Sequence, residues 1–298
     1  MMEFQKLSGD ELVARLLELE SLEGLQAFLT ACRKELEQLR LRCSDQDWNE
    51  FVDSESASQL RQAFSEDPYC ARGLLKPRGY AGDAVLIDYI YGTCALPDET
   101  SPRGSRINKW MASESKAFEA VRHRRKLAAI YIDKAIAKDP AARILSIACG
   151  HLRELTLCHF DRAQWAGELI AVDQDAKSLA VVHQTYGDER IKAQRLRISS
   201  LLDETADLGK FDLIYSTGLT DYLDDSLVRA LSSWCKRSLN VGGVSFLANF
   251  DQCEERGFME TVMEWPLIYR NQAKFGALVG AKCKTFSDHI GVVCYAEF

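Results

Sequence analysis

After Pro140, short apolar runs alternate with helical patterns, and this alternation constrains the fold more than any other feature. The runs are ARILSIAC, ELIAVD, FDLIYS, GGVSFLANF and GVVCYAEF. Helical segments separate the first four, which predicts a parallel sheet with helices on both faces. The last two candidate strands, near residues 281–286 and 291–298, are too close in sequence for a crossover helix. We therefore expect them to pair as an antiparallel hairpin at the sheet edge.

The chain before residue 105 has a different, helical texture. Ser8 and Glu11 form a candidate capping box, and leucines follow them at helical spacing. Residues 96–104 contain two prolines and a glycine, which is typical of a linker. One long helix is expected over residues 105–138. The sequence thus predicts an α/β protein with a helical cap, residues 1–104, and a sheet domain, residues 105–298.

Composition excludes several classes of function. The 298 residues carry a net charge of -7, so we expect no nucleic-acid partner. The basic run RHRRK at residues 122–126 is then interpreted as a solvated helix face. No apolar run reaches the roughly 18 residues of a membrane span, and the first residues lack the apolar core of a signal peptide. The ten cysteines include no C-x-x-C pair, which favours reduced thiols in a cytoplasmic protein without a metal site.

Two residues at the ends of the first two strands indicate a nucleoside site. Gly150 follows the first strand in SIACGHLREL, and Asp173 ends the second strand 23 positions later. This is close to the roughly 20-residue spacing at which an acidic side chain binds ribose hydroxyls. A G-x-G-x-x-G loop for a pyrophosphate is absent, so an adenosine without phosphate, as in S-adenosylmethionine (SAM), fits better. The alternative is that Gly150 serves only as a strand-to-helix turn.

The order of segments over residues 105–298 resembles that of class I SAM-dependent methyltransferases. Asp173 is followed by ISSLLDE, FDLIYSTGLTDYL, NVGGVSFLANF and the final hairpin. Ser146, Ala148 and Leu152 stand where the family's first motif has an acidic residue and two of its three glycines. The resemblance implies a Rossmann-like sheet, SAM as cofactor and methyltransferase activity (EC 2.1.1.-). It implies these cofactor-binding residues: Ala148, Gly150, Asp173, Gln174, Ser200, Leu201, Tyr215 and Ser216.

Two further segments resemble a narrower group, the bacterial 3-hydroxypalmitic acid methyl ester biosynthesis methyltransferases. They are KPRGYAGD, residues 76–83, and MEWPLIYR, residues 263–270. Arg78 and Tyr80 offer a cation and a phenol for a carboxylate, and Asp83 could bind the ammonium of SAM or cap a helix. We assign all three to cofactor binding. The alternative for Tyr80 is ordinary packing between cap and core.

The substrate side is expected to include Tyr222, Tyr269 and Arg270, although Arg270 could instead be a structural salt-bridge partner. A carboxylate acceptor is already ionised at neutral pH, whereas a hydroxyl or amine acceptor benefits from a general base. Candidates for a catalytic side chain lack distinguishing neighbours in the sequence. They are Tyr80, His151 and Glu260, with Asp221 and His289 as further candidates for a base.

The leading hypothesis is therefore methyl transfer from SAM to an oxygen of a small or lipid-like carboxylic acid. One alternative is O- or N-methylation of another small metabolite in a biosynthetic pathway. The other is a non-catalytic SAM-fold module that binds a ligand or a partner. The apolar helical faces of residues 9–40 are compatible with a monomer or a homodimer.

Overall fold

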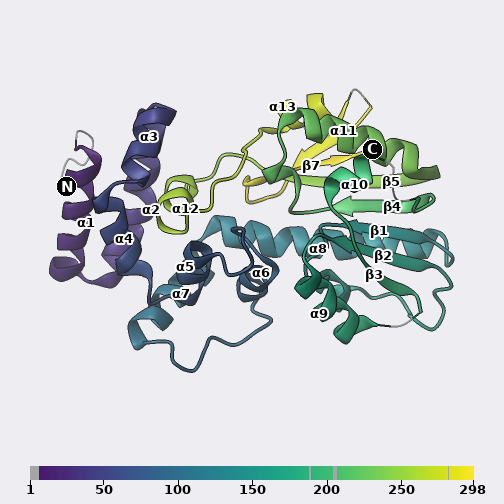
Figure 1. Ribbon diagram of the computed structural model, residues 1–298, viewed down its shortest axis with the longest axis horizontal. Helices are drawn as coiled ribbons and strands as arrows, with labels where there is room; N and C mark the ends of the chain where they lie inside the picture. Colours follow the sequence, from purple (N-terminus) through teal and green to yellow (C-terminus); the bar gives the residue numbers. More distant parts are fainter. Residues whose placement is uncertain (1–6, 188, 204–206, 281) are drawn as a thin grey trace. The chain divides into compact units, whose positions relative to one another are not determined.

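The computed structural model of the protein describes residues 7–187, 189–203, 207–280 and 282–298 (Figure 1). The chain forms two compact units. The first contains the residues up to Glu119 together with Cys253–Pro266, and the second contains Ala120–Gln252 and Leu267–Phe298. The first unit is thus discontinuous in sequence, and the cap boundary at residue 104 stays a prediction.

The first unit is helical, as expected. Ser8 and Glu11 form the predicted capping box. Phe28 and Phe64 stack at 5.3 Å between ring centroids, and Phe258 contacts Phe64 edge-on at 5.0 Å. Aromatic burial therefore anchors the inserted segment in the helical core. The helices are α1 (Gly9–Glu23), α2 (Leu25–Arg42), α3 (Asp45–Val52), α4 (Glu55–Phe64), α5 (Pro68–Leu75), α6 (Ala84–Tyr91), α7 (Pro102–Glu114) and α12 (Arg256–Val262).

The prediction of a single long helix over residues 105–138 is wrong, because two helices occupy this stretch. Helix α7 ends at Glu114, and α8 (Lys116–Lys138) begins immediately after Ser115. The Ser115 backbone is extended, and its hydroxyl accepts a hydrogen bond from the Phe118 N–H at 3.2 Å. Ser115 thus caps α8 and interrupts the helical pattern. The contact boundary between the two units falls within α8.

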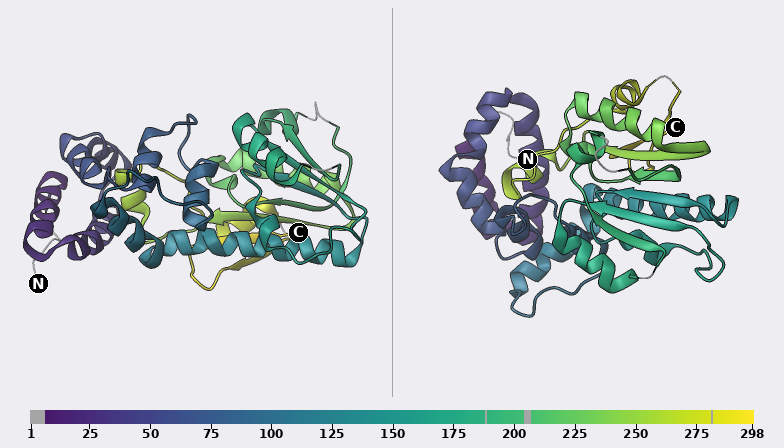
Figure 2. Two further views of the ribbon diagram at one scale, coloured as in Figure 1. Left: turned by 90° about the horizontal axis from the view of Figure 1, so that it is seen from below. Right: turned by 45° about the vertical axis from the view of Figure 1, so that its right-hand side comes forward.

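The second unit contains a seven-stranded sheet in the order β3-β2-β1-β4-β5-β7-β6 (Figures 1 and 2). Strands β1 to β5 pair in parallel, whereas β7 is antiparallel to both β5 and β6. The Rossmann-like α/β fold predicted from the sequence, with its antiparallel hairpin, is confirmed. Residue 281, where the sixth strand was expected to begin, lies outside the described residues. The strands are β1 (Arg143–Ile147), β2 (Glu168–Asp173), β3 (Ile191–Arg195), β4 (Phe211–Ser216), β5 (Leu239–Phe250), β6 (Lys284–Ser287) and β7 (Val293–Glu297).

Helices bury both faces of this sheet. One face of the sheet forms an apolar core with residues of the helices that cover it, such as Leu231 and Phe275. On the other face, Tyr131 of α8 stacks on Phe246 of β5 at 4.1 Å between ring centroids. The alternation of side chains along β5 explains this division, because Leu247 faces the first core. The remaining helices are η2 (Arg153–Leu157), α9 (Ala176–Tyr186), α10 (Ile198–Leu202), η3 (Thr220–Tyr222), α11 (Asp225–Ser238) and α13 (Gln272–Val279).

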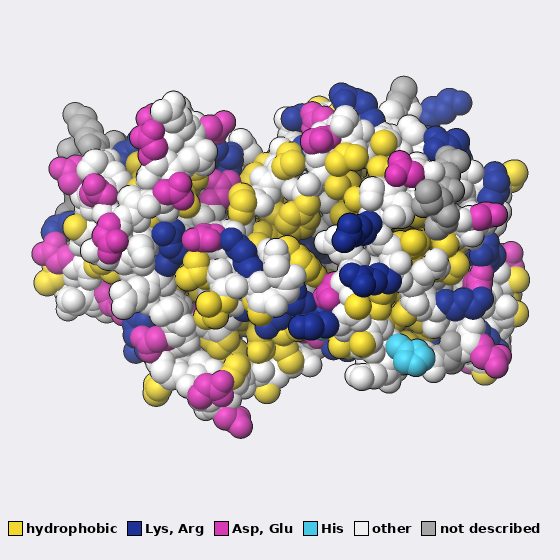
Figure 3. All heavy atoms as spheres, in the orientation of Figure 1, with side chains coloured by type: hydrophobic (Ala, Val, Ile, Leu, Met, Phe, Trp, Pro, Cys, Tyr) yellow, Lys and Arg dark blue, Asp and Glu magenta, His cyan; other side chains and the backbone are white. Residues whose placement is uncertain are grey.

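The surface carries both signs of charge. Figure 3 shows acidic and basic side chains interspersed over the face drawn, with apolar side chains between them. Within the described part of the chain, no helix combines the length and the apolar character that a bilayer crossing requires.

Candidate functional site

The loop after β1 is held in an unusual backbone conformation. Ala148, Gly150 and Leu152 have φ angles of 53°, 52° and 54°, in the left-handed region. Glycine reaches this region freely, but alanine and leucine do so at a cost of roughly 1–2 kcal/mol each. Ala148 and Leu152 are the positions at which the sequence departs from the expected glycines. The loop therefore keeps a glycine-type backbone at two positions that are not glycine. Such backbone strain is common in functional loops.

Asp173 joins this loop to the end of β2. Its Oδ2 accepts a hydrogen bond from the Gly150 N–H at 2.9 Å, and its Oδ1 accepts one from the Asp175 N–H at 2.9 Å. The side chain is 8% exposed. Burial raises the pKa of this carboxyl, while the two backbone donors oppose that shift. The structure thus brings together the two residues that the sequence spacing selects, at the carboxyl ends of two parallel strands.

The end of β4 lies beside β1 and is braced from within. The Tyr215 hydroxyl donates to Glu154 Oε1 at 2.6 Å, and the Ser216 hydroxyl donates to the Ile147 carbonyl at 2.8 Å. Burial raises the pKa of both Tyr215 and Glu154. These contacts tie β4 to β1 and to η2, so both predicted pocket residues have a bracing role. Sequence reasoning missed Glu154, although it is the one acidic residue in SIACGHLREL.

The other predicted cofactor residues of this unit lie near the ends of β2 and β3. Gln174 is exposed, and its backbone carbonyl accepts a hydrogen bond from Arg195 Nε at 3.1 Å. Ser200 and Leu201 lie on α10, where Leu201 is buried in the apolar core and Ser200 is half-buried. His151 is buried within the loop after β1. Their roles toward a cofactor stay predictions.

The loop between β4 and α11 is fixed by Arg270, which is 1% exposed. Its guanidinium donates to the Thr220 and Leu223 carbonyls, to Asn249 Oδ1 and to Asp225 Oδ1. This set of partners fits the structural alternative for Arg270, and a substrate contact stays a prediction. The two tyrosines expected on the substrate side differ in exposure. Tyr222 is 43% exposed, whereas Tyr269 is half-buried.

Asp221 of the same loop forms a buried ion pair with Arg124 of α8. Arg124 Nη1 is 3.6 Å from Asp221 Oδ2, and the Phe250 N–H donates to Asp221 Oδ1 at 2.6 Å. Burial raises the pKa of Asp221 to about 6, although Arg124 acts in the opposite direction. The interpretation of RHRRK as a solvated face is wrong for Arg124, which is 6% exposed. Its spacing on one helix face with the buried Ala120 and Ala128 was the available signal.

His289, a further candidate for a base, lies in the second unit, where its ring contacts His123 at 4.8 Å between centroids. The predicted residues of KPRGYAGD, and Glu260, belong to the first unit. Gly79 and Gly82, in the loop before α6, have left-handed φ angles of 86° and 70°. Asp83 caps α6 through the Val85 and Leu86 N–H groups and forms a two-point ion pair with Arg72 at 2.8 Å. These contacts fit the capping alternative.

Three other first-unit residues complete the predicted set. Arg78 and Tyr80 are half-buried in the loop between α5 and α6. Glu260 on α12 pairs with Arg40 at 3.1 Å and with Arg256 at 2.8 Å. These two ion pairs occupy both carboxylate oxygens of Glu260, and any catalytic role for it stays a prediction.

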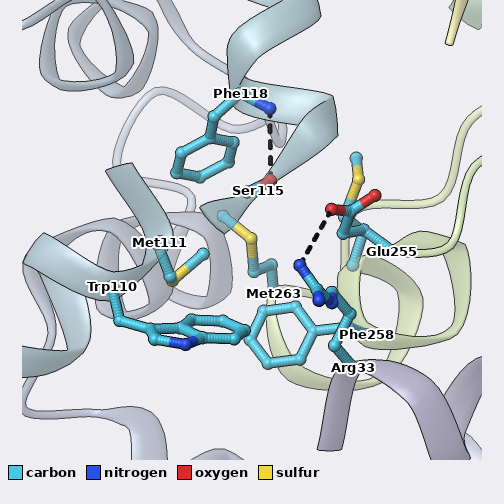
Figure 4. Close-up of a pocket in the computed structure, with 9 residues that line it drawn as sticks. Arg33, Trp110, Met111, Ser115, Phe118, Glu255, Phe258 and Met263 are labelled. Atoms are coloured by element: carbon cyan, nitrogen blue, oxygen red, sulfur yellow. Dashed lines mark hydrogen bonds and ion pairs between the residues drawn. The ribbon is translucent and has the colours of Figure 1, made fainter. Parts of the chain in front are cut away.

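A small pocket in the first unit was not anticipated from the sequence (Figure 4). Arg33 and Glu255 face each other across it at 4.0 Å, and Glu255 also accepts the Lys116 N–H at 2.8 Å. Burial raises the pKa of Glu255. None of the predicted site residues lines this pocket. The lining residues are Arg33, Trp110, Met111, Ser115, Phe118, Glu255, Phe258, Met259 and Met263.

Comparisons with known proteins bear on the fold. No protein-family model matches the chain. Over 107 residues the chain is 27% identical to the uncharacterized protein RP028 of Rickettsia prowazekii (strain Madrid E), a match that covers 36% of this chain and 42% of that protein. The matched part therefore spans less than half of this curated relative.

Solved structures with a similar fold include a possible exported protein from Bordetella parapertussis. It is 16% identical, with a TM-score of 0.65, and the match covers 100% of this chain and 98% of that one. Magnesium protoporphyrin IX methyltransferase (ChlM) from Synechocystis PCC 6803 with bound SAH is 12% identical, with a TM-score of 0.47, covering 70% of this chain and 90% of that one. At 16% identity, the similarity to the Bordetella parapertussis protein concerns the fold alone.

Proposed function

We propose that this chain is a SAM-dependent methyltransferase that transfers a methyl group to an oxygen of a small or lipid-like carboxylic acid. The observation that carries the proposal is the hydrogen bond between Gly150 and Asp173 at the carboxyl edge of the sheet. Strand order reverses between β1 and β4, and ligands of open α/β sheets bind in the crevice at such a point.

The residues present fit an adenosine-containing cofactor. The left-handed turn at Gly150 lets a ligand approach the backbone closely, because glycine has no side chain there. Each oxygen of Asp173 accepts one backbone N–H, which leaves acceptor capacity for ribose hydroxyls. Gly150 would face the amino-acid part of SAM and Asp173 its ribose. The cofactor supplies an activated methyl group on a sulfonium.

The methyl acceptor that we propose is a carboxylate. Since a carboxylate is ionised at neutral pH, no side chain has to remove a proton, and the protein contributes positioning and exclusion of water. The choice of acceptor rests on the resemblance of residues 76–83 and 263–270 to the fatty-ester group. A cytoplasmic location and a monomeric or dimeric state belong to the same proposal.

Calorimetric titration with S-adenosylhomocysteine tests the cofactor. We expect wild type to bind and Asp173→Ala to lose binding. Asp212→Ala is the matched control, because Asp212 lies at the amino end of β4 and its carboxylate accepts the Arg143 N–H at 2.8 Å. Asp212→Ala should bind like wild type. Absence of binding by the wild-type protein would contradict the proposal and favour a module that binds other partners.

Labelled SAM then tests the acceptor with fatty and aromatic carboxylic acids. The transfer rate should be flat with pH above the carboxylic acid's pKa, because the acceptor needs no base. A rate that instead rises with the deprotonation of a protein side chain would favour a hydroxyl or amine acceptor.

A further inference from the structure

Two buried arginines contact the loop between β4 and α11, and they differ in how their hydrogen-bond donors are used. Arg270 donates to four acceptors, as described above. Arg124 is 6% exposed and has an ion-pair partner in Asp221, but it makes no hydrogen bond to any residue that the structure describes. Its Nε is fully buried without a partner. A guanidinium keeps its charge in proteins, so buried donors of this kind carry a desolvation cost.

The free donors of Arg124 lie on one edge of the guanidinium. Asp221 faces Nη1, and the Arg124 Cζ lies over the Phe250 ring, 5.6 Å from its centroid. This leaves Nε and Nη2, which point in parallel and match the two oxygens of a carboxylate. Nη2 lies next to Gly218, where an added Cβ would be 3.4 Å away. A glycine at this position keeps the Nη2 side open.

Two other arginines of this chain bind a carboxylate through the same Nε–Nη2 edge of the guanidinium. Arg72 holds Asp83 through Nε and Nη2, each 2.8 Å from one carboxylate oxygen. Arg103 holds Glu20 through the same two nitrogens, also at 2.8 Å each. In both pairs the Nε–Nη2 edge engages a carboxylate side-on. Arg124 on α8 presents this edge beside Gly218, in the loop that follows β4.

We propose that Arg124 binds the carboxylate of the methyl acceptor side-on through Nε and Nη2. The proposal rests on the function proposed above and deepens it, because it assigns the acceptor group to a residue. Asp221 holds the guanidinium by Nη1 and Phe250 supports its face, so the fork is oriented before the acceptor arrives. The acceptor class that this arrangement recognises is a monocarboxylic acid, and a neutral amide or alcohol lacks the charge for it.

Two titrations test the proposal in order. S-adenosylhomocysteine is titrated first into wild type, Arg124→Gln and Lys126→Gln, the last being an exposed cation on the same helix. All three should bind it equally. Octanoate and benzoate, with octanamide and benzamide as neutral controls, are then titrated into the S-adenosylhomocysteine-loaded proteins. We expect the carboxylates to bind wild type and Lys126→Gln, and to bind Arg124→Gln roughly tenfold or more weakly, since charge-assisted hydrogen bonds are lost.

Gly218→Ala provides a second variant in case Arg124→Gln fails to fold. Its methyl group would occupy the space beside Nη2, so carboxylate affinity should fall while S-adenosylhomocysteine affinity stays. Equal carboxylate binding by wild type and by the folded Arg124 or Gly218 variants would overturn the role of Arg124. Binding of S-adenosylhomocysteine without any carboxylate, or with equal binding of the amides, would overturn the acceptor class. Failure of wild type to bind S-adenosylhomocysteine would instead count against the proposed function.

Discussion

The Gly150 N–H donates to Asp173 Oδ2 over 2.9 Å, so one hydrogen bond joins the loop after β1 to the end of β2. This contact places a flexible-backbone residue and an acidic side chain at the same edge of the sheet. The strain in the loop around Gly150 and the buried charges beside β4 lead to three predictions, and the packing of α12 leads to a fourth.

The left-handed conformation of Ala148 predicts a stabilising substitution. Ala148 is exposed, with a φ angle of 53°, so Ala148→Gly removes the strain at little packing cost. The strain of about 1–2 kcal/mol exceeds the cost of about 0.5–1 kcal/mol for a more flexible unfolded chain. We expect the free energy of unfolding in urea to rise by up to about 1 kcal/mol. Ala141→Gly, in a turn outside the left-handed region, should lower it, and an equal change in both variants would refute the strain argument.

The raised pKa of Asp221 predicts a pH dependence of stability. Its pKa is about 6 in the folded protein against a reference value of 3.8, so the folded state favours the protonated carboxyl. The stabilisation is therefore full below about pH 4 and is lost as pH rises through about 6. Relative to Asp221→Asn, wild type should gain about 2 kcal/mol between pH 7 and pH 4. Urea unfolding of both proteins across this range measures the difference, and parallel pH curves would contradict it.

The saturated contacts of Arg270 predict a large loss of stability on truncation. Arg270→Ala removes the Arg270 donors to the Leu223 carbonyl and to Asn249 Oδ1, and it leaves the Thr220 carbonyl with the Leu223 N–H at 3.2 Å. Breaking a buried charged network costs about 3–5 kcal/mol. Lys274 pairs with the same Asp225 at 3.4 Å but is half-exposed, so Lys274→Ala should cost less than about 1 kcal/mol. Denaturant midpoints compare the two, and similar losses would show that burial is not decisive.

The aromatic contact of Phe258 predicts that α12 supports the helical unit. Phe258→Ala removes a ring that is 3% exposed and lies edge-on to Phe64. A cost of about 3–5 kcal/mol is expected for such a cavity. Amide hydrogen exchange should accelerate in α2 and α4, while the strands β1 and β2 exchange as in wild type. Uniform acceleration in helices and sheet alike would mean that the two units unfold as one.

Much of the fold follows from patterns that act over short distances in the chain. Alternating apolar runs predict the strands, and parallel strands bring their carboxyl ends to one edge, which is why Gly150 and Asp173 could be paired from their spacing. The break at Ser115 escaped prediction because an uncapped helix through it is equally compatible with the apolar spacing. A single serine hydroxyl decides between the two.

The buried charges could not be assigned in the same way. Arg124 stands in a basic run whose neighbours are more exposed, and its burial depends on what α8 contacts in the folded chain. Arg270 was predicted to contact substrate, but its partners Thr220, Leu223 and Asn249 come from two other segments. Which guanidinium donors of a buried arginine lack a partner depends on the folded structure, and local sequence patterns do not predict it.

The insertion of α12 into the helical unit has a consequence for synthesis of the chain. Cys253–Pro266 leaves the sheet unit after β5 and rejoins it at Leu267. The ribosome therefore synthesises helices α1 to α7 long before the segment that completes their core. Five strands, β1 to β5, are translated between Phe64 and its aromatic partner Phe258. The part of the protein made first is finished only when the sheet is nearly complete, so its nascent helices depend on late-arriving sequence for their final packing.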